Sequence, residues 1–299
     1  MTTPKIELGH RLFYDTRLSG NGTYACASCH DQARAFTDGR AQALGATGEL
    51  HPRGAMSLTN VAYNLSFGWY DPGLRSLENQ AAVPMFNEHP VELGVKGYEA
   101  EVLARFATAI DTAQFAAAFP GAATVVSLTL IEKAIAAFER TLLSGNSPFD
   151  RFLYRDDRAA LSDSARRGMD IFFSKRTKCS ECHSGFNLSG PTQIEGTEPE
   201  APVFHQTGVG QFRAPTLRNI AVTAPYMHDG RLPSLEAVVA HYARGGDPVS
   251  RGQKKSDRLR GFRISAQESA DLVEFMKSLT DTDFLASAAA RVPAKSERR

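Results

Sequence analysis

Two copies of one short pattern contain every cysteine of this chain. The first copy is Cys26–His30 (CASCH), and the second is Cys179–His183 (CSECH). The spacing Cys-x-x-Cys-His is the attachment pattern of c-type haem, in which two thiols bond to the porphyrin vinyl groups and the adjacent histidine binds the iron. Two copies with no cysteine left over predict two covalent haems. The predicted attachment residues are Cys26, Cys29, Cys179 and Cys182, and the predicted iron ligands are His30 and His183.

Four cysteines and two histidines also fit two other kinds of site. They could hold a structural zinc ion, and a Cys-x-x-Cys pair can act as a redox dithiol. The cysteine pairs of a zinc ribbon usually lie close in sequence, whereas these lie about 150 residues apart. Neither alternative explains why histidine follows the second cysteine in both copies, so the pattern favours haem.

The length of 299 residues suits two domains of ordinary size, each with its own core. One attachment motif then falls in each half. The turn Ser144–Pro148 (SGNSP) is the best boundary between them. It predicts an N-terminal domain at residues 1–147 and a C-terminal domain at residues 148–299.

The charges nearly balance, with 34 Lys and Arg against 33 Asp and Glu. This composition argues against nucleic-acid binding and against a polybasic membrane patch, so a partner would be met through a local patch. Near balance also predicts that contacts with a protein partner depend little on salt. No apolar run approaches the roughly 20 residues that span a bilayer, and the first residues lack the apolar core of a signal peptide.

Apolar spacing and alanine content predict helices in both halves. The expected helices cover 6–14, 98–108, 112–119, 127–143, 162–173, 234–244 and 265–279. Residues 34–97 are rich in Gly, Pro and Asn, which predicts long ordered loops with short helices. Residues 185–210 are expected to form a polar loop, and no alternating strand is expected. The predicted fold is mainly α, with two cytochrome c-like domains and long ordered loops.

The segment before the second motif repeats the segment before the first. Gly168–Phe172 (GMDIF) echoes Gly9–Phe13 (GHRLF), and Ser162 can cap the later helix. Ser265 and Glu268 have the spacing of a capping box for the last helix. The chain therefore reads as a diverged internal duplication.

Further motifs support a family resemblance. They are GHRLFYD (9–15), AFTDG (35–39), SLENQ (76–80), HPVELG (89–94), APTLRN (214–219), and TAPYMHDG (223–230) followed by LEAV (235–238). Together with the two haem motifs, they resemble the bacterial di-haem cytochrome c peroxidase and MauG superfamily over most of the chain. The stretch VPMFNEHP (83–90) is most similar to the methanobactin-associated MauG-like branch (MbnH).

The second axial position of each iron decides between an electron carrier and a catalyst. Chemistry alone leaves it open among the methionines, several tyrosines and the histidines His10, His51, His89, His205, His228 and His241. In the superfamily, the residue seventeen positions after the proline of the Thr-x-Pro-Tyr block binds the second haem; this residue is Tyr242 here. It is methionine in typical peroxidases and tyrosine in MauG-like enzymes. A phenolate stabilises oxidised iron more than a thioether does, and His241 remains an alternative ligand.

The resemblance also implies the residues around the first haem. Glu92 is then its distal carboxylate, and Gln80 and Pro84 line its pocket. A carboxylate there can take a proton from peroxide and return it, which is general acid–base catalysis. Trp69, the only tryptophan, corresponds to a residue between the two haems, where an indole can pass an electron hole. His51 falls in the loop where peroxidases carry a distal histidine, but its neighbours do not match.

Family members often hold a calcium ion between the domains. The ligands are backbone oxygens at the positions of Thr223 and Pro225 together with an asparagine side chain. The asparagine position corresponds to Gly54 here, so water would have to replace that side chain.

The resemblance implies a di-haem oxidoreductase that uses hydrogen peroxide to form a high-valent state. That state would oxidise a residue, tryptophan in the methanobactin-associated branch, on a partner protein such as a copper-binding MbnP-like protein. One alternative is a cytochrome c peroxidase that takes electrons from a small cytochrome or cupredoxin. Another is a plain electron-transfer protein. Because covalent c-type haem is normally made on the outer side of the bacterial inner membrane, we expect a periplasmic protein.

Overall fold

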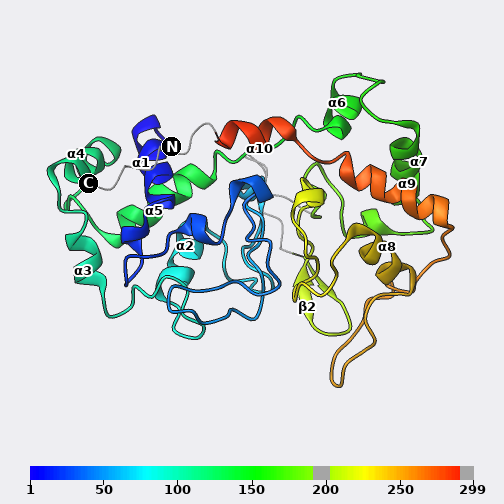
Figure 1. The fold of residues 1–299 in the computed structure, drawn as a ribbon, viewed down its shortest axis with the longest axis horizontal. Coiled ribbons are helices and arrows are strands. Elements are labelled where there is room, and N and C mark those ends of the chain that lie inside the picture. Colours follow the sequence, from blue (N-terminus) through cyan, green and yellow to red (C-terminus); the bar gives the residue numbers. More distant parts are fainter. Residues whose placement is uncertain (191–202, 290–299) are drawn as a thin grey trace.

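The computed structural model describes residues 1–190 and 203–289, and these residues form a mainly helical fold (Figure 1). This confirms the predicted fold class. The α-helices are α1 (Thr3–Phe13), α2 (Leu77–Phe86), α3 (Glu99–Ala104), α4 (Ala109–Ala118), α5 (Leu128–Glu139), α6 (Pro148–Tyr154), α7 (Asp163–Phe172), α8 (Leu235–Ala243), α9 (Ala266–Lys277) and α10 (Thr282–Ala289).

Two hydrophobic cores lie side by side along the long axis of the molecule (Figure 1). The first is built from α1, α2, α4 and α5, and the second from α7, α8 and α9. Helix α10 returns to the first core, where Phe284 packs against Phe36 with ring centroids 6.0 Å apart. Each core surrounds one attachment motif, while the boundary at residue 147 stays a prediction.

The same close helix crossing occurs once in each core. A Cβ atom on Gly9 of α1 would lie 1.8 Å from the carbonyl oxygen of Ala134 in α5. A Cβ atom on Gly168 of α7 would lie 1.9 Å from the carbonyl oxygen of Asp271 in α9. Only glycine permits backbones to approach this closely. The two glycines that the sequence repeat aligns thus permit the same close contact between two helices. This equivalence supports the internal duplication.

A buried polar network joins the two cores. Asn60 and Ser144 exchange two hydrogen bonds of 2.8 Å. Asn219 donates to Ser144 Oγ at 3.2 Å and to Thr59 Oγ1 at 3.3 Å, and its own Oδ1 accepts from the backbone N–H of Asp281 at 2.8 Å. All five residues are less than 5% exposed. Because buried polar groups need partners, this network fixes how the segments at residues 60, 144, 219 and 281 meet.

The predicted helix caps are confirmed. Ser162 accepts a hydrogen bond from the backbone N–H of Ala165 at the start of α7. At the start of α9, Ser265 and Glu268 form both bonds of the capping box, at 3.2 and 2.8 Å. These caps satisfy N–H groups that the first helical turn leaves free.

The expectation of no strand was wrong. Residues Phe204–Gln206 (β1) and Gln211–Arg213 (β2) form a short antiparallel hairpin in which His205 pairs with Phe212. Most of β1 and its turn lie in the stretch expected as a polar loop, of which residues 191–202 fall outside the described residues. Helix α2 lies in the region expected to combine long loops with short helices.

Among the described helices, none combines the length and the apolar character needed to cross a lipid bilayer.

Candidate haem-binding sites

Each attachment motif begins with one turn of 3₁₀ helix, at Cys26–Ser28 and at Cys179–Glu181. The turn brings the two thiols and the histidine of each motif together, and all four cysteines are free and half-buried. Two thiols on one turn beside a histidine match the donor set that c-type haem requires.

The two motif histidines are oriented in the same way. His30 Nδ1 lies 2.8 Å from the carbonyl oxygen of Phe36, and His183 Nδ1 lies 3.0 Å from that of Leu188. Phe36 and Leu188 both have left-handed backbone angles, with φ of 62° and 49°. When Nδ1 donates to a carbonyl, the Nε2 lone pair is free to bind iron. The local backbone therefore presets the tautomer that a haem ligand needs.

Burial keeps these rings neutral. It lowers the pKa of His183 to about 4 and also lowers the pKa of His30. Burial likewise raises the pKa of the Cys29 thiol to about 11, with Asp38 and Glu92 adding to the effect. A neutral imidazole is the metal-binding form of histidine.

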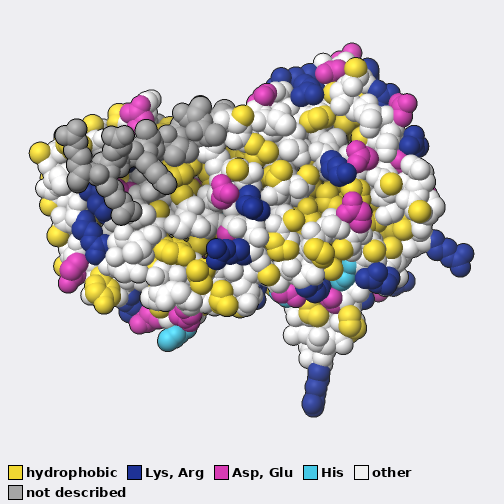
Figure 2. Space-filling view, viewed as in Figure 1, with side chains coloured by type: hydrophobic (Ala, Val, Ile, Leu, Met, Phe, Trp, Pro, Cys, Tyr) yellow, Lys and Arg dark blue, Asp and Glu magenta, His cyan; other side chains and the backbone are white. Residues whose placement is uncertain are grey.

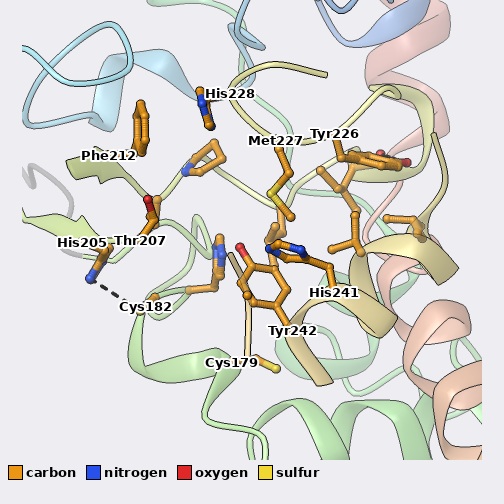
Figure 3. A pocket seen from close by; sticks show the side chains of 18 of the residues that line it. Cys179, Cys182, His205, Thr207, Phe212, Tyr226, Met227, His228, His241 and Tyr242 are labelled. Carbon is orange, nitrogen blue, oxygen red and sulfur yellow. Dashed lines mark hydrogen bonds between the residues drawn. The ribbon is translucent and has the colours of Figure 1, made fainter. Parts of the chain in front are cut away.

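A cavity of about 350 Å³ adjoins the second motif (Figure 3). Cys179, Cys182 and His183 line it, and Tyr242 from α8 points into it. Much of the remaining wall is apolar, from Phe172, Leu235, Val238, Val239, Leu272 and Met276. A porphyrin needs an apolar slot with a few placed donors, so these residues fit a haem held by two thioether bonds, His183 and one further ligand.

Tyr242 and His241 both line this cavity. Burial raises the pKa of Tyr242 to about 12, and the nearby Cys182 and Cys179 add to the rise. A bound cation opposes such a rise, because positive charge favours the phenolate. The histidine left open by the sequence, His241, is 8% exposed. Tyr242 as the ligand stays a prediction.

The structure places three other histidine and aromatic groups here that sequence reasoning did not assign. His205 Nδ1 lies 3.5 Å from Cys182 Sγ, and the His228 ring stacks on Phe212 at a centroid distance of 4.4 Å. His205 and Phe212 come from the β-hairpin, which forms one wall of the cavity. Strands of three residues are too short to show an alternating pattern, so this wall could not be predicted from the sequence.

Glu92 lies close to the first motif. Its charge acts on the Cys29 thiol, and its backbone carbonyl accepts a hydrogen bond from the Ala46 N–H at 2.7 Å. Burial raises the pKa of Glu92, against the opposing influence of His51 and of a hydrogen bond from Asn87. A half-buried carboxyl with a raised pKa is suited to giving and taking a proton.

Gln80 and Pro84 lie one turn apart on the same face of α2. Proline has no N–H, so the helix lacks the hydrogen bond that would join position 84 to the Gln80 carbonyl. The Pro84 carbonyl accepts from the Leu93 N–H at 2.8 Å, next to Glu92. Helix α2 and the Glu92 segment are thus joined directly, as the predicted pocket requires.

Trp69 lines the cavity of the second site although it precedes α2 in the chain. Its indole Nε1 donates to the Gly54 carbonyl at 3.4 Å, and its own carbonyl accepts from the Arg213 N–H of β2 at 3.0 Å. Trp69 therefore lies where segments of both halves meet. Its role in passing electrons stays a prediction.

The predicted calcium ligands Thr223 and Pro225 line the same cavity, as does Gly54. A Cβ atom at Gly54 would lie 2.3 Å from the Arg40 carbonyl oxygen, so this backbone has no room for an asparagine side chain. Calcium binding stays a prediction.

Comparison with known proteins identifies the family. The pattern of the family described as di-haem cytochrome c peroxidase matches residues 3–158. The methylamine utilization protein MauG of Methylorubrum extorquens is 33% identical over 289 residues, which cover 93% of this chain and 79% of the relative. Cytochrome-c peroxidase IdrP1 of Denitromonas iodatirespirans is also 33% identical, over 95% of this chain and 83% of the relative.

A crystal structure of a MauG-like protein associated with microbial copper homeostasis superposes with a TM-score of 0.89. It is 39% identical, and the match covers 96% of this chain and 92% of that protein. The two attachment motifs, the cavity lined by Cys179, Cys182, His183 and Tyr242, and these similarities all indicate the same family. The chain belongs to the di-haem cytochrome c peroxidase and MauG family and is a peroxide-dependent di-haem oxidoreductase.

Proposed function

We propose that this MauG-like enzyme uses hydrogen peroxide to oxidise an aromatic side chain, tryptophan first, on a partner protein. The observation that carries the proposal is that Tyr242 lines one cavity together with His183, Cys179 and Cys182. A phenolate in place of a thioether stabilises oxidised iron, so the second haem is suited to holding an oxidising equivalent rather than passing electrons quickly.

Two covalent haems attached at Cys26, Cys29, Cys179 and Cys182 are the proposed cofactors, with His30 and His183 beneath the irons. When bound, they accept the two oxidising equivalents of one hydrogen peroxide molecule. The chain supplies the proton chemistry. Glu92 is the proposed base and acid, because burial raises the pKa of its carboxyl and its backbone is held against Ala46.

Gln80 and Pro84 are proposed to line the pocket in which Glu92 transfers the proton. They face the same side of α2, and the Pro84 carbonyl fixes the Leu93 N–H beside Glu92. Trp69 is the proposed route for electrons between the two halves, because it contacts Gly54 on one side and Arg213 on the other.

The partner is proposed to be a copper-binding protein of the MbnP kind. Support comes from the 39% identical MauG-like structure, which is described as associated with microbial copper homeostasis. A small cytochrome or cupredoxin would replace this partner if the enzyme only removed peroxide. Because both haems are proposed to be thioether-linked, we also propose a periplasmic location.

Substitution of Tyr242 by methionine tests the proposal. We expect the midpoint potential of the second haem to rise, because a thioether stabilises the ferric state less than a phenolate does. His241→Gln is the control for the alternative ligand and should leave the potential nearly unchanged. Equal potentials in Tyr242→Met and the wild type would remove Tyr242 from the ligand set.

The reaction itself is tested by mass spectrometry. Peroxide added to the enzyme with a co-encoded partner should give an oxidised aromatic residue on that partner, with low turnover of small-molecule donors. Rapid turnover with a reduced small cytochrome and an unmodified partner would instead establish the peroxidase function. Low-temperature EPR of the resting ferric protein should show one high-spin and one low-spin haem; two low-spin haems would point to a plain electron-transfer protein.

A further inference from the structure

The wall of the cavity that contains Tyr242 carries far more positive than negative charge. Two carboxylates line it, from Asp38 and Asp247. Seven cationic side chains line it, from Arg40, Arg176, Lys178, Arg213, Arg231, Arg258 and Arg260. Ion pairs with carboxylates hold five of these cations, namely Arg176, Lys178, Arg231, Arg258 and Arg260, whereas Arg40 and Arg213 form no ion pair among the described residues. Arg213 is among the deepest, and burial lowers its pKa to about 10.

A projecting segment extends this positive charge away from the cavity. The segment at residues 244–263, here called the basic arm, contains seven Lys and Arg but only two Asp. It is the orange loop that projects from the second half in Figure 1, and Figure 2 shows basic side chains at its tip. Without the arm, the chain has 27 basic and 31 acidic residues. The near balance of the whole sequence therefore conceals one strongly positive region.

Backbone hydrogen bonds fix the arm beside Tyr242. At its base, the Gly245 N–H donates to the Tyr242 carbonyl at 2.9 Å, and the Phe262 N–H donates to the Ala243 carbonyl at 3.0 Å. Farther out, the Gly208 N–H of the β-hairpin turn donates to the Lys254 carbonyl at 3.0 Å. The arm is held at both ends of this span, so its charges have a defined position relative to the cavity.

The outermost cations are available to a partner. Arg251 and Lys254 are exposed, and no ion pair involves either of them among the described residues. Nearer the cavity, Arg258 pairs with Glu181 at 3.1 Å and Arg260 pairs with Asp257 at 2.7 Å. Long-range attraction would thus begin at the tip and be followed by closer contacts at the cavity rim.

We propose that the basic arm, together with Arg258 and Arg260 at the rim of the cavity, forms the docking site of an acidic protein partner. This rests on the proposed function, since it names the surface chemistry of the protein that the enzyme oxidises. A negative patch on that protein, next to its oxidised residue, would meet Arg251, Lys254 and the rim and bring this residue close to the cavity that Tyr242 lines. The expectation of weak salt dependence, which rested on net charge alone, is replaced by strong salt dependence.

The location of the positive charge on this chain favours a protein partner over other polyanions. Nucleic acids and anionic membranes engage a broad positive face, whereas the chain outside the arm is slightly acidic. The arm instead gathers its charge in one projecting segment whose base is hydrogen-bonded to the Tyr242 carbonyl, beside the cavity that a macromolecule must approach to exchange electrons.

The test uses two electron-donor proteins of opposite charge. Reduced plastocyanin with an acidic patch and reduced mitochondrial cytochrome c with a basic one are each mixed with holoenzyme and peroxide. Every peroxide takes up two protons and two electrons and yields two water molecules, so two donor molecules are oxidised. We expect the second-order rate for plastocyanin to exceed that for cytochrome c at low salt and to fall steeply as salt is added.

The double substitution Arg251→Glu with Lys254→Glu should lower the plastocyanin rate at low salt by about ten-fold or more, since steering changes association by about 10- to 1,000-fold. The matched control is Lys133→Glu with Arg155→Glu, which makes the same charge change at exposed residues away from the arm. The control should keep at least most of the rate. Equal rates and equal salt dependence in the two variants would overturn the docking site.

A second measurement separates this proposal from the proposed function. The spectral change that peroxide causes without any donor should be the same in both double variants, because neither touches a haem-site residue. If no partner residue is ever oxidised but plastocyanin still depends on the arm, the docking site stands and the substrate assignment fails. If the arm variant loses only binding to a short DNA duplex, measured by fluorescence anisotropy, the docking proposal fails.

Discussion

Asp281 Oδ2 accepts a hydrogen bond from Ser144 Oγ at 3.1 Å, although the two residues lie 137 positions apart in the sequence. The same oxygen also accepts from the backbone N–H groups of Gly145 and Asn146, both at 2.9 Å. One buried carboxylate therefore holds the turn that connects the first core to the second. Charge-assisted bonds of this kind are about twice as strong as neutral ones.

Substitution of Asp281 by alanine should destabilise the protein by about 2–4 kcal/mol, because four donors, including the Phe284 N–H, would lose their acceptor inside the fold. Burial opposes ionisation of Asp281, but hydrogen bonds from Phe284, Asn146 and Gly145 lower its pKa. The stabilisation is present above the ordinary Asp pKa and is lost as pH falls. Urea unfolding at pH 7 and pH 3 measures this, and the exposed Asp283→Ala is the control. A difference that persists unchanged at pH 3 would contradict the assignment.

The contribution of Glu139 to stability should change with pH in the direction opposite to that of Asp281. It is 5% exposed on α5, its Oε2 has no partner among the described residues, and burial raises its pKa to about 8. Arg140 opposes this rise and Glu78 adds to it. A raised folded-state pKa means that stability is full below the ordinary Glu pKa and is lost as pH rises toward about 8.

Glu139→Gln should remove this loss. Relative to the wild type, the variant should gain up to about 1.4 kcal/mol per pH unit across that window. Urea unfolding at pH 5, 6.5 and 8 would show the trend, with the exposed Glu101→Gln as control. Parallel pH profiles for Glu139→Gln and the wild type would mean that Glu139 is ionised in the folded protein.

Glu92→Gln should preserve both covalent haems and their resting spectra but slow the reaction with peroxide by about 100- to 10,000-fold, the usual value of acid–base catalysis. Stopped-flow absorbance after peroxide mixing is the measurement. Glu88→Gln is the matched control, because Glu88 lies in the same loop but is exposed and pairs with Lys96. A wild-type rate in Glu92→Gln would assign the proton transfer to another group.

Gly54→Asn should lower the melting temperature rather than create a calcium site. The new Cβ atom would lie 2.3 Å from the Arg40 carbonyl oxygen, and such overpacking costs about 1–3 kcal/mol. Gly48→Asn is the control, since a Cβ atom there meets nothing within 4 Å and asparagine tolerates a positive φ. Calorimetry with and without calcium provides the readout; a melting temperature of Gly54→Asn that rises with calcium would show that the side chain completes the ion's coordination.

The features that the sequence predicted well are local or repeated. The haem motifs need only five adjacent residues, and the caps at Ser162 and Ser265 need only four. The alignment of Gly9–Phe13 with Gly168–Phe172 predicted an internal duplication, which the two matching helix crossings support. Each of these signals is complete within one short segment.

What the sequence did not predict depends on contacts between distant segments. The helix expected at 127–143 ends at Glu139, and the Leu142 carbonyl instead accepts from the Asn60 N–H at 2.9 Å. The β-hairpin has strands of only three residues, too short to show an alternating pattern. The contact between His205 and Cys182 follows from that hairpin, so it was equally invisible.

The return of α10 to the first core has a consequence for synthesis on the ribosome. Phe284 packs against Phe36, and Gln32 Nε2 donates to the Leu285 carbonyl at 3.5 Å, so both contacts link residues about 250 positions apart. N-terminal segments generally fold first as a chain emerges. Here the first core gains its last buried ring only after nearly the whole second core has been translated, so the two haem-bearing halves reach their final packing together.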